Sequence, residues 1–269
     1  MKSLVLQRGW LGRCPAWCGL ILWLALVPPA TAGERPIVAA ASDLQFALPE
    51  VAERFTAETG RTVRLNFGSS GNFRRQIEQG APFELYLSAD EAYVEALHRA
   101  GRTVDGGTLY AIGRVVVIAP AGDPAGIVDG SLAALAEAFA AGDINRFAIA
   151  NPEHAPYGVA ARQALESAGL WDDLRPHLVY GENVSQATRF ALSGDTAGGL
   201  VAYSLARAPA IAARADYALV AAEDHAPLRQ RMVLIEGAGE TASAFHDYLQ
   251  GESAREILSA YGFVTPEAD

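Results

Sequence analysis

The sequence predicts an α/β fold with largely parallel sheets, because short apolar segments alternate with longer amphipathic ones along most of the chain. Several apolar segments are continuous, as in Val115-Val116-Val117-Ile118, which is typical of strands that helices cover on both faces. Glycine follows many of the amphipathic segments, and a glycine just beyond a helix commonly ends it. Two arrangements remain open: one large sheet, or two smaller sheets joined near residues 110–119.

Each expected element rests on its local pattern. Short apolar segments predict strands at residues 37–41, 62–67, 84–88, 115–119, 147–150, 178–180, 199–202 and 232–235. Apolar residues at helical spacing predict helices at residues 51–59, 73–79, 91–100, 132–141, 159–168, 185–192, 242–250 and 254–261. The predicted elements therefore alternate between strand and helix up to the strand at residues 199–202, and the strand at residues 232–235 then precedes two consecutive helices.

The first 32 residues differ from the rest of the 269-residue chain. Lys2, Arg8 and Arg13 precede an apolar segment at residues 19–27, and Ala30-Thr31-Ala32 places small residues at a cleavage site. This order is typical of a secretory signal peptide, so we expect residues 1–32 to be removed and the protein to be periplasmic. Both cysteines lie in this leader, and neither follows the small residue expected before a lipidated cysteine.

The composition and charge of the chain exclude several classes of protein. The chain is 51% hydrophobic and 19% charged, which is the composition of a globular protein and not of a disordered one. After the leader it has 18 arginines, no lysine and 31 acidic residues, a formal charge of −13. A negative charge of this size argues against nucleic acid and anionic membranes as partners.

Four junctions between a predicted strand and a predicted helix carry polar residues. Ser42, with Gln45 three residues later, has the pattern of a capping box, and Ser69 and Ser70 lie between Gly68 and Gly71. The other two junctions are residues 151–158, which contain Tyr157, and residues 181–185, which contain Val184. Because helix N-termini present unpaired N–H groups and a partial positive charge, several of them together would bind a small oxyanion without any basic side chain.

Each junction also has an ordinary structural interpretation. Ser42 alone is usually a helix cap, the serine pair a turn, Tyr157 a half-buried aromatic residue and Val184 part of the core. Motifs of nucleophilic, zinc-dependent or nucleotide-binding enzymes are absent from the sequence, and no base partner is identifiable for the serine pair. His154 beside Glu153 lacks a second residue at metal-ligand spacing. We therefore expect that the protein is not an enzyme, that it holds no cofactor and that none of its side chains binds a metal ion.

Together these junctions resemble the periplasmic molybdate-binding proteins of ABC importers. The similarity runs from about residue 36 to residue 264, and its motifs stand at residues 38–42, 67–71, 75–82, 87–90, 151–158 and 261–263. The resemblance implies a two-lobed periplasmic binding protein of type II-like architecture, with a mainly parallel sheet in each lobe and a ligand cleft between them. Residues 33–113 plus 229–269 would form the first lobe, and residues 114–228 the second.

The resemblance also implies the residues that hold the anion. Ser42 and Ser70 would donate hydroxyls and backbone N–H groups, Tyr157 its N–H and hydroxyl, and Val184 its backbone N–H. Ser69 is a further candidate. Asp43 is a candidate as well, although a carboxylate facing the pocket would repel a dianion, so we expect it to point outward. If it faces the ligand instead, it could accept a proton and favour a protonated oxyanion.

The function implied is that of a monomeric, non-catalytic receptor. It would capture molybdate, and also tungstate, between its lobes and deliver the anion to an ABC permease in the inner membrane. A receptor for sulfate, phosphate or a small organic acid remains an alternative within the same class. Two alternatives lie outside transport: a serine hydrolase with Ser70 as the nucleophile, and a sensor that signals through a partner.

Overall fold

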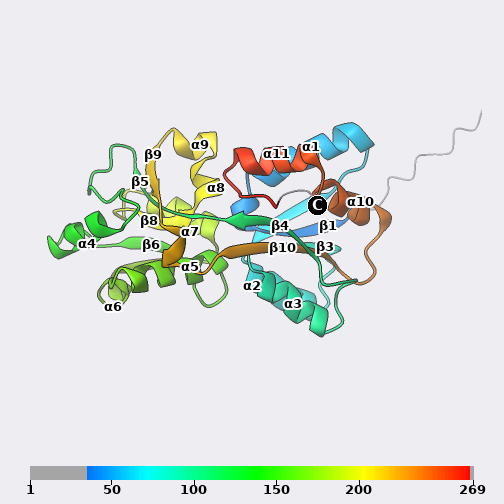
Figure 1. Cartoon of the computed structure of the whole chain (residues 1–269), viewed down its shortest axis with the longest axis horizontal. Coiled ribbons are helices and arrows are strands. Elements are labelled where there is room, and N and C mark those ends of the chain that lie inside the picture. The colour runs from blue at the N-terminus through cyan, green and yellow to red at the C-terminus, as the bar shows by residue number, and fades with distance from the viewer. Residues whose placement is uncertain (1–34, 267–269) are drawn as a thin grey trace, which may run out of the picture. The chain divides into compact units, whose positions relative to one another are not determined.

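The computed structural model describes residues 35–266, which form two five-stranded mixed sheets flanked by helices (Figure 1). The predicted signal peptide, residues 1–32, lies outside the described residues. The two smaller sheets that the sequence left open are thus found in place of one large sheet.

The first sheet has the strand order β2-β1-β3-β10-β4. Its strands are β1 (Ile37–Ala41), β2 (Arg64–Gly68), β3 (Leu85–Ser88), β4 (Thr108–Gly113) and β10 (Leu228–Leu234). Strand β1 pairs in parallel with β2 and β3, whereas β10 is antiparallel to β3 and β4. The parallel half places the carboxyl ends of β1, β2 and β3 at one edge of the sheet.

The second sheet repeats this design, with the order β7-β6-β8-β5-β9. Its strands are β5 (Val115–Pro120), β6 (Phe147–Ala150), β7 (Leu178–Gly181), β8 (Gly199–Ala202) and β9 (Ala215–Leu219). Strand β6 is parallel to β7 and β8, and β5 is antiparallel to β8 and β9. The sheets are therefore mixed, and the predicted parallel character holds for half of the pairings in each.

Two of the four antiparallel pairings involve strands that the apolar pattern did not reveal, β4 and β9. Strands β4 and β9 lie at sheet edges, and β9 is partly exposed and carries Asp216 as its second residue, so it lacks a continuous apolar segment. Strand β10 begins four residues before the predicted strand, because Arg229 and Arg231 alternate there with buried Leu228 and Gln230. Alternation is typical of a strand with one covered face, whereas the prediction relied on continuous segments.

The chain passes twice between the sheets. It leaves the first sheet after Gly113 and enters the second at Val115, and it returns between Leu219 at the end of β9 and Leu228 at the start of β10. Residues 110–119 thus belong to two strands in different sheets. The lobe limits 33–113 plus 229–269 and 114–228 stay a prediction.

Helices pack against both sheets, and their bounds agree with the predicted ones to within a few residues. They are α1 (Ala47–Thr59), α2 (Ser70–Glu78), α3 (Glu91–Arg99), α4 (Ala133–Ala140), α5 (Pro156–Ser167), α7 (Val184–Ala191), α10 (Glu240–Tyr248) and α11 (Glu252–Ala260). Shorter turns are α6 (Trp171–Leu174), α8 (Tyr203–Ala206), α9 (Pro209–Ala212) and the 3-10 turns η1 (Ser42–Leu44), η2 (Arg175–His177) and η3 (Ala222–Asp224). In the first sheet, α1 and α11 lie side by side on one face and α2 and α3 on the other (Figure 1).

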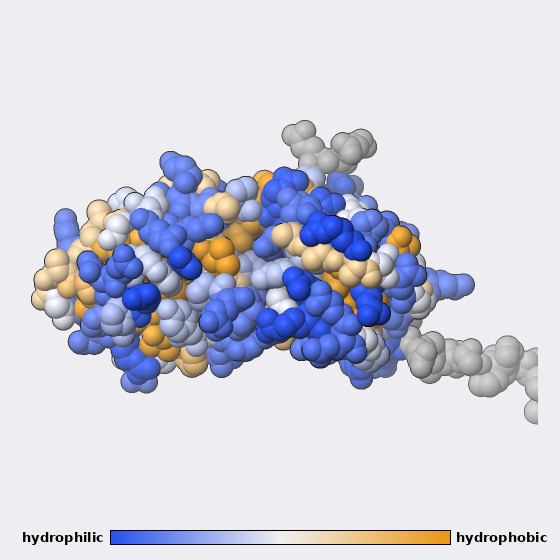
Figure 2. Space-filling model, turned by 90° about the horizontal axis from the view of Figure 1, so that it is seen from below, coloured by the Kyte–Doolittle hydropathy of each residue, from blue (hydrophilic) through white to orange (hydrophobic). Residues whose placement is uncertain are grey.

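The interior of the protein is built from the central strands. Every residue of β5 from Val115 to Ala119 is fully buried, as are Val38, Ala39 and Ala40 of β1. On the face shown in Figure 2, hydrophilic residues predominate and apolar ones form small separate patches, in keeping with the charge of the chain. Within residues 35–266 no helix is both long enough and apolar enough to span a membrane.

Candidate functional site

The candidate site is a small cavity at the carboxyl ends of strands from both sheets. It contains about 190 Å³ of space that atoms do not fill, including open solvent. All six residues that the sequence analysis singled out line it, and its lining consists of Ala41, Ser42, Asp43, Gly68, Ser69, Ser70, Ala89, Ala155, Pro156, Tyr157, Asn183 and Val184. Segments up to 143 residues apart therefore meet at one place, as expected for ligand sites at the carboxyl ends of parallel strands.

Helix starts surround this cavity. Ser42 begins η1 directly after β1, and Ser70 begins α2 shortly after β2. Tyr157 is the second residue of α5, where Pro156 occupies the first position, and Val184 is the first residue of α7. The first N–H groups of a helix have no partner within it, so each start directs donors and a partial positive charge at the cavity.

The two serine hydroxyls are buried and already accept hydrogen bonds. Ser70 Oγ accepts from the backbone N–H of Ala89 at 3.0 Å, and Ser42 Oγ accepts from that of Ser185 at 3.4 Å. The two residues are only 1% and 4% exposed, respectively. A hydroxyl that accepts one bond retains its own proton to donate. Both side chains can thus serve as donors to a bound anion.

The predicted capping box at Ser42 is wrong. The residue that precedes η1 is Ala41, and no side chain caps this turn. The Gln45 carboxamide oxygen accepts a hydrogen bond from the hydroxyl of Ser185 in α7 instead of reaching back to its own turn. Since η1 is only three residues long, Gln45 lies beyond it and is directed at the neighbouring helix.

The expectation that Asp43 points outward is also wrong. Its side chain is 1% exposed, and its Oδ2 accepts a hydrogen bond from Gln230 Nε2 at 2.5 Å. The turn that carries Asp43 packs against α7 and α8, where the Ser204 hydroxyl donates to the Asp43 carbonyl at 2.8 Å, so its side chain has no route to solvent. Burial raises the pKa of Asp43 to about 6, although hydrogen bonds from Gln230 and Tyr157 lower it.

Gln230 is a residue of the site that the sequence analysis did not identify. It is fully buried in β10, where its Oε1 accepts a hydrogen bond from the Tyr110 hydroxyl at 2.6 Å. Its Nε2 donates to Asp43 and, at 3.3 Å, to the hydroxyl of Tyr157. A single amide thus joins both sheets beneath the cavity. No local sequence pattern identifies Gln230, since it is a single polar residue in a strand whose buried and partly exposed residues alternate.

Ser69 has a partner that the sequence did not reveal. Its hydroxyl lies 2.9 Å from Nδ1 of His154 and 2.5 Å from the carbonyl oxygen of the same residue. The backbone N–H of Gly71 donates to that carbonyl at 2.9 Å, and His154 Nε2 lies 3.6 Å from a carboxylate oxygen of Glu182. His154 stands in the segment 151–158 that the sequence analysis selected, so the segment was found but its contact was not.

The charge pattern of the cavity is unusual for an anion site. None of its twelve lining residues is an arginine, a lysine or a histidine. Within residues 35–266, no group of three or more histidine, cysteine, aspartate or glutamate side chains is arranged to hold a metal ion. The arrangement supplies hydroxyls and backbone N–H groups, which are donors for an oxyanion, together with one carboxyl, that of Asp43.

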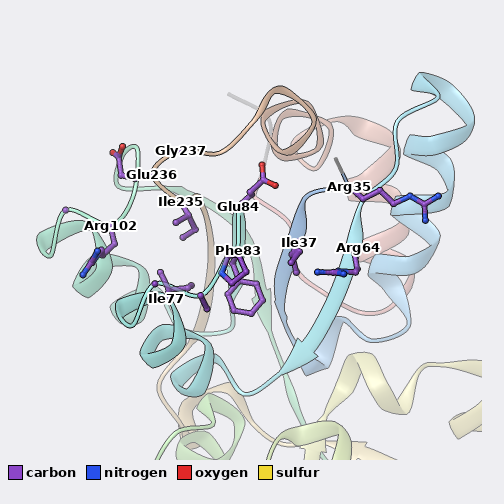
Figure 3. A pocket seen from close by; sticks show the side chains of 14 residues that line it. Arg35, Ile37, Arg64, Ile77, Phe83, Glu84, Arg102, Ile235, Glu236 and Gly237 are labelled. Atoms are coloured by element: carbon purple, nitrogen blue, oxygen red, sulfur yellow. The ribbon is translucent and has the colours of Figure 1, made fainter. Parts of the chain in front are cut away.

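A larger depression lies at the opposite, amino-terminal edge of the first sheet (Figure 3). It encloses about 1390 Å³, including open solvent, and Arg35, Arg64 and Arg102 contribute to it together with Glu84 and Glu236. Arg102 donates to the carbonyl of Glu78, and Glu84 accepts from the N–H of Gly239. None of the six sequence-selected residues lines this depression.

Comparison with known proteins places this geometry in a family. The family model described as "Bacterial extracellular solute-binding protein" matches residues 37–264. The molybdate-binding protein ModA of Rhodobacter capsulatus is 37% identical to this chain, over 91% of this chain and 94% of that protein. The molybdate-binding protein ModA of Escherichia coli is 32% identical, over 96% of this chain and 99% of that protein. The periplasmic molybdate-binding protein of Azotobacter vinelandii superimposes with a TM-score of 0.79 at 32% identity, over 87% of this chain and all of that one.

Proposed function

The chain belongs to the bacterial extracellular solute-binding proteins, and from this premise we propose that it captures molybdate in the cavity described above. Tungstate, which has the same charge and tetrahedral shape, would bind in the same way. The bound anion would then be delivered to an ABC permease in the inner membrane, with the receptor acting in the periplasm after removal of residues 1–32.

One observation carries this proposal: Ser42, Ser70, Tyr157 and Val184, at four separate helix starts, line one cavity without a cationic side chain. A fully ionised oxyanion can only accept hydrogen bonds, so a cavity rich in donors suits it. Hydrogen bonds to a charged group contribute roughly 1.5–3 kcal/mol each. Six or seven of them would support about micromolar or tighter binding after the cost of association.

Selection among oxyanions would depend on size. The donors are fixed on η1 and α2, which follow strands of the first sheet, and on α5 and α7, which follow strands of the second. A large tetrahedral anion reaches donors on both sides, whereas a smaller one leaves some of them buried and unpaired. Each unpaired buried donor costs about 1–3 kcal/mol. Sulfate would therefore bind much more weakly than molybdate.

Isothermal titration of residues 33–269, purified free of ligand, tests the proposal. Molybdate and tungstate are expected to bind at one site per chain, and sulfate and phosphate to give no saturable heat under the same conditions. Saturable sulfate or phosphate binding without molybdate binding would contradict the molybdate assignment. With that result, the protein would still be an oxyanion receptor, but one specific for sulfate or phosphate.

A hydrolase that uses Ser70 is not favoured by the hydrogen bonds of this junction. His154 contacts Ser69, and the Ser70 hydroxyl accepts from the backbone of Ala89. No labelling of the protein by a fluorophosphonate is therefore expected. Labelling at Ser70 would support the hydrolase instead.

A further inference from the structure

We propose that Asp43 enters the complex as a neutral carboxylic acid and donates a hydrogen bond from Oδ1 to the bound oxyanion. Capture of one anion would then take up one proton. This inference rests on the proposed oxyanion binding and adds to it the residue that ties binding to pH and to the basicity of the ligand.

The direction of the hydrogen bonds around Asp43 assigns the two carboxyl oxygens. The Tyr110 hydroxyl donates to Gln230 Oε1, which leaves Gln230 Nε2 as the donor toward Asp43. Oδ2 of Asp43 is therefore an acceptor. When the carboxyl is neutral, its proton consequently lies on Oδ1.

Oδ1 is the atom available to a ligand. It is buried and has no hydrogen-bond partner of acceptable geometry among residues 35–266. An unpaired buried polar atom is costly, so its presence in a folded protein calls for an explanation. Asp43 lines the cavity together with Ser42 and Ser70, and an anion placed there would supply the missing acceptor.

Burial favours the neutral form of Asp43, whereas its hydrogen-bond donors favour the ionised one, and burial is the larger effect. The titratable groups that face it are the hydroxyls of Tyr110 on β4 and Tyr157 on α5. The other donors near the carboxyl are the Gln230 amide on β10 and the backbone N–H groups of Asp43 and Leu44, and the Ser204 hydroxyl on α8 contacts the backbone carbonyl of Asp43. No cationic side chain is among them. Burial already raises the pKa of Asp43 to about 6, and a dianion placed beside it would raise that pKa further.

A neutral acid in the cavity would discriminate between anions by basicity. A carboxylic acid donates its strongest hydrogen bonds to the more basic oxygen. Sulfate is a weaker base than molybdate, so it gains less from Asp43. An ionised Asp43 would instead repel every dianion, in a cavity where water does not screen the charge.

The test is calorimetric titration of ligand-free protein with sodium molybdate between pH 7 and pH 9. Titrations in Tris and in HEPES, whose ionisation enthalpies differ, give the number of protons absorbed. Wild-type protein is expected to absorb about one proton per anion, and its Kd to rise about tenfold per pH unit, because the free carboxyl must be protonated on binding. Asp43→Asn, which stays neutral, is expected to absorb none and to bind with a Kd independent of pH.

Asp90→Asn is the matched control. Burial also raises the pKa of Asp90, but this residue does not line the cavity, and asparagine can replace it as the cap of α3. The Asp90 variant is expected to keep the full proton uptake. Molybdate binding by wild-type protein with no proton uptake and a constant Kd would overturn the inference and leave the proposed function intact. Absence of molybdate binding at every pH by folded protein would overturn both.

Discussion

The hydroxyl of Ser69 lies 2.9 Å from Nδ1 of His154, although the two residues are 85 positions apart in the sequence. Ser69 follows β2 of the first sheet, and His154 follows β6 of the second. The contact therefore joins the two sheets beside the cavity. The bond from the Gly71 N–H to the His154 carbonyl strengthens the same junction.

Removal of the His154 side chain is expected to weaken anion binding without unfolding the protein. His154→Ala deletes the imidazole contacts with Ser69 and Glu182 but keeps the backbone bonds of the junction. The loss of one buried hydrogen bond, about 1 kcal/mol, corresponds to a rise in Kd of about fivefold. Titration calorimetry with molybdate measures this rise in Kd. His177→Ala, at a partly exposed histidine outside the cavity, is the control, and an unchanged Kd in the His154 variant would contradict the role of this junction.

Ser42→Ala and Ser70→Ala are expected to differ in their effect on stability. Both variants remove a hydroxyl donor from the cavity, so both should raise the Kd for molybdate by about tenfold or more. Ser70→Ala also leaves the buried N–H of Ala89 without an acceptor, which costs about 1–3 kcal/mol of unfolding free energy. Ser42→Ala gives up only a long 3.4 Å bond and should unfold near the wild-type urea concentration.

Urea unfolding and titration of the two serine variants separate these effects. Ser243→Ala, at a partly exposed serine of α10 outside the cavity, is the control for both measurements. If neither cavity variant alters anion affinity, the two hydroxyls do not contact the ligand.

Gly113→Ala is expected to disrupt the network beneath the cavity. A Cβ at this position would lie 2.3 Å from the hydroxyl of Tyr157 and 2.7 Å from Nε2 of Gln230. Both groups are buried, so they must move, and we expect lower stability together with weaker anion binding. Thermal unfolding and calorimetry provide the two measurements.

Gly106→Ala is the matched control, because a Cβ there meets no heavy atom within 4 Å and its φ is not positive. It is expected to behave as wild type in both measurements. Equal behaviour of the two glycine variants would mean that the packing around Tyr157 and Gln230 is looser than the structure describes.

Asp43→Asn is expected to stabilise the ligand-free protein near pH 7.5 and to lose this effect near pH 4. The folded-state pKa of Asp43, about 6, is above its ordinary value of 3.8, so the folded state holds the proton more tightly than the unfolded one. Stability therefore falls as the pH rises from 4 to 6, by up to about 3 kcal/mol at about 1.4 kcal/mol per pKa unit. Asparagine does not ionise and avoids this loss.

Urea unfolding of wild-type protein and the Asp43 variant at pH 4, 6 and 7.5 measures the difference. A gap in unfolding free energy that is the same at all three values would show that Asp43 does not titrate between them. Asp90→Asn again serves as the control substitution.

Much of the fold could be predicted because strands and helices leave periodic patterns. The strands Ile37–Ala41, Phe147–Ala150 and Gly199–Ala202 coincide with their predicted bounds, since each is a short continuous apolar segment. Strands β4 and β9 escaped prediction. Edge strands exposed on one side carry a weaker apolar signal, and the boundary between β4 and β5 lies inside one apolar segment.

The sequence by itself determined which residues gather at the site, because each lies at a junction where a strand ends and a helix starts. Ser42, Ser69, Ser70, Tyr157 and Val184 all reach one cavity for this reason. Only the tertiary structure decided the direction of Asp43, the partner of Ser69 and the presence of Gln230. These three features depend on contacts between segments 85 to 187 residues apart. A local sequence pattern cannot predict which distant side chain will cover a carboxyl group.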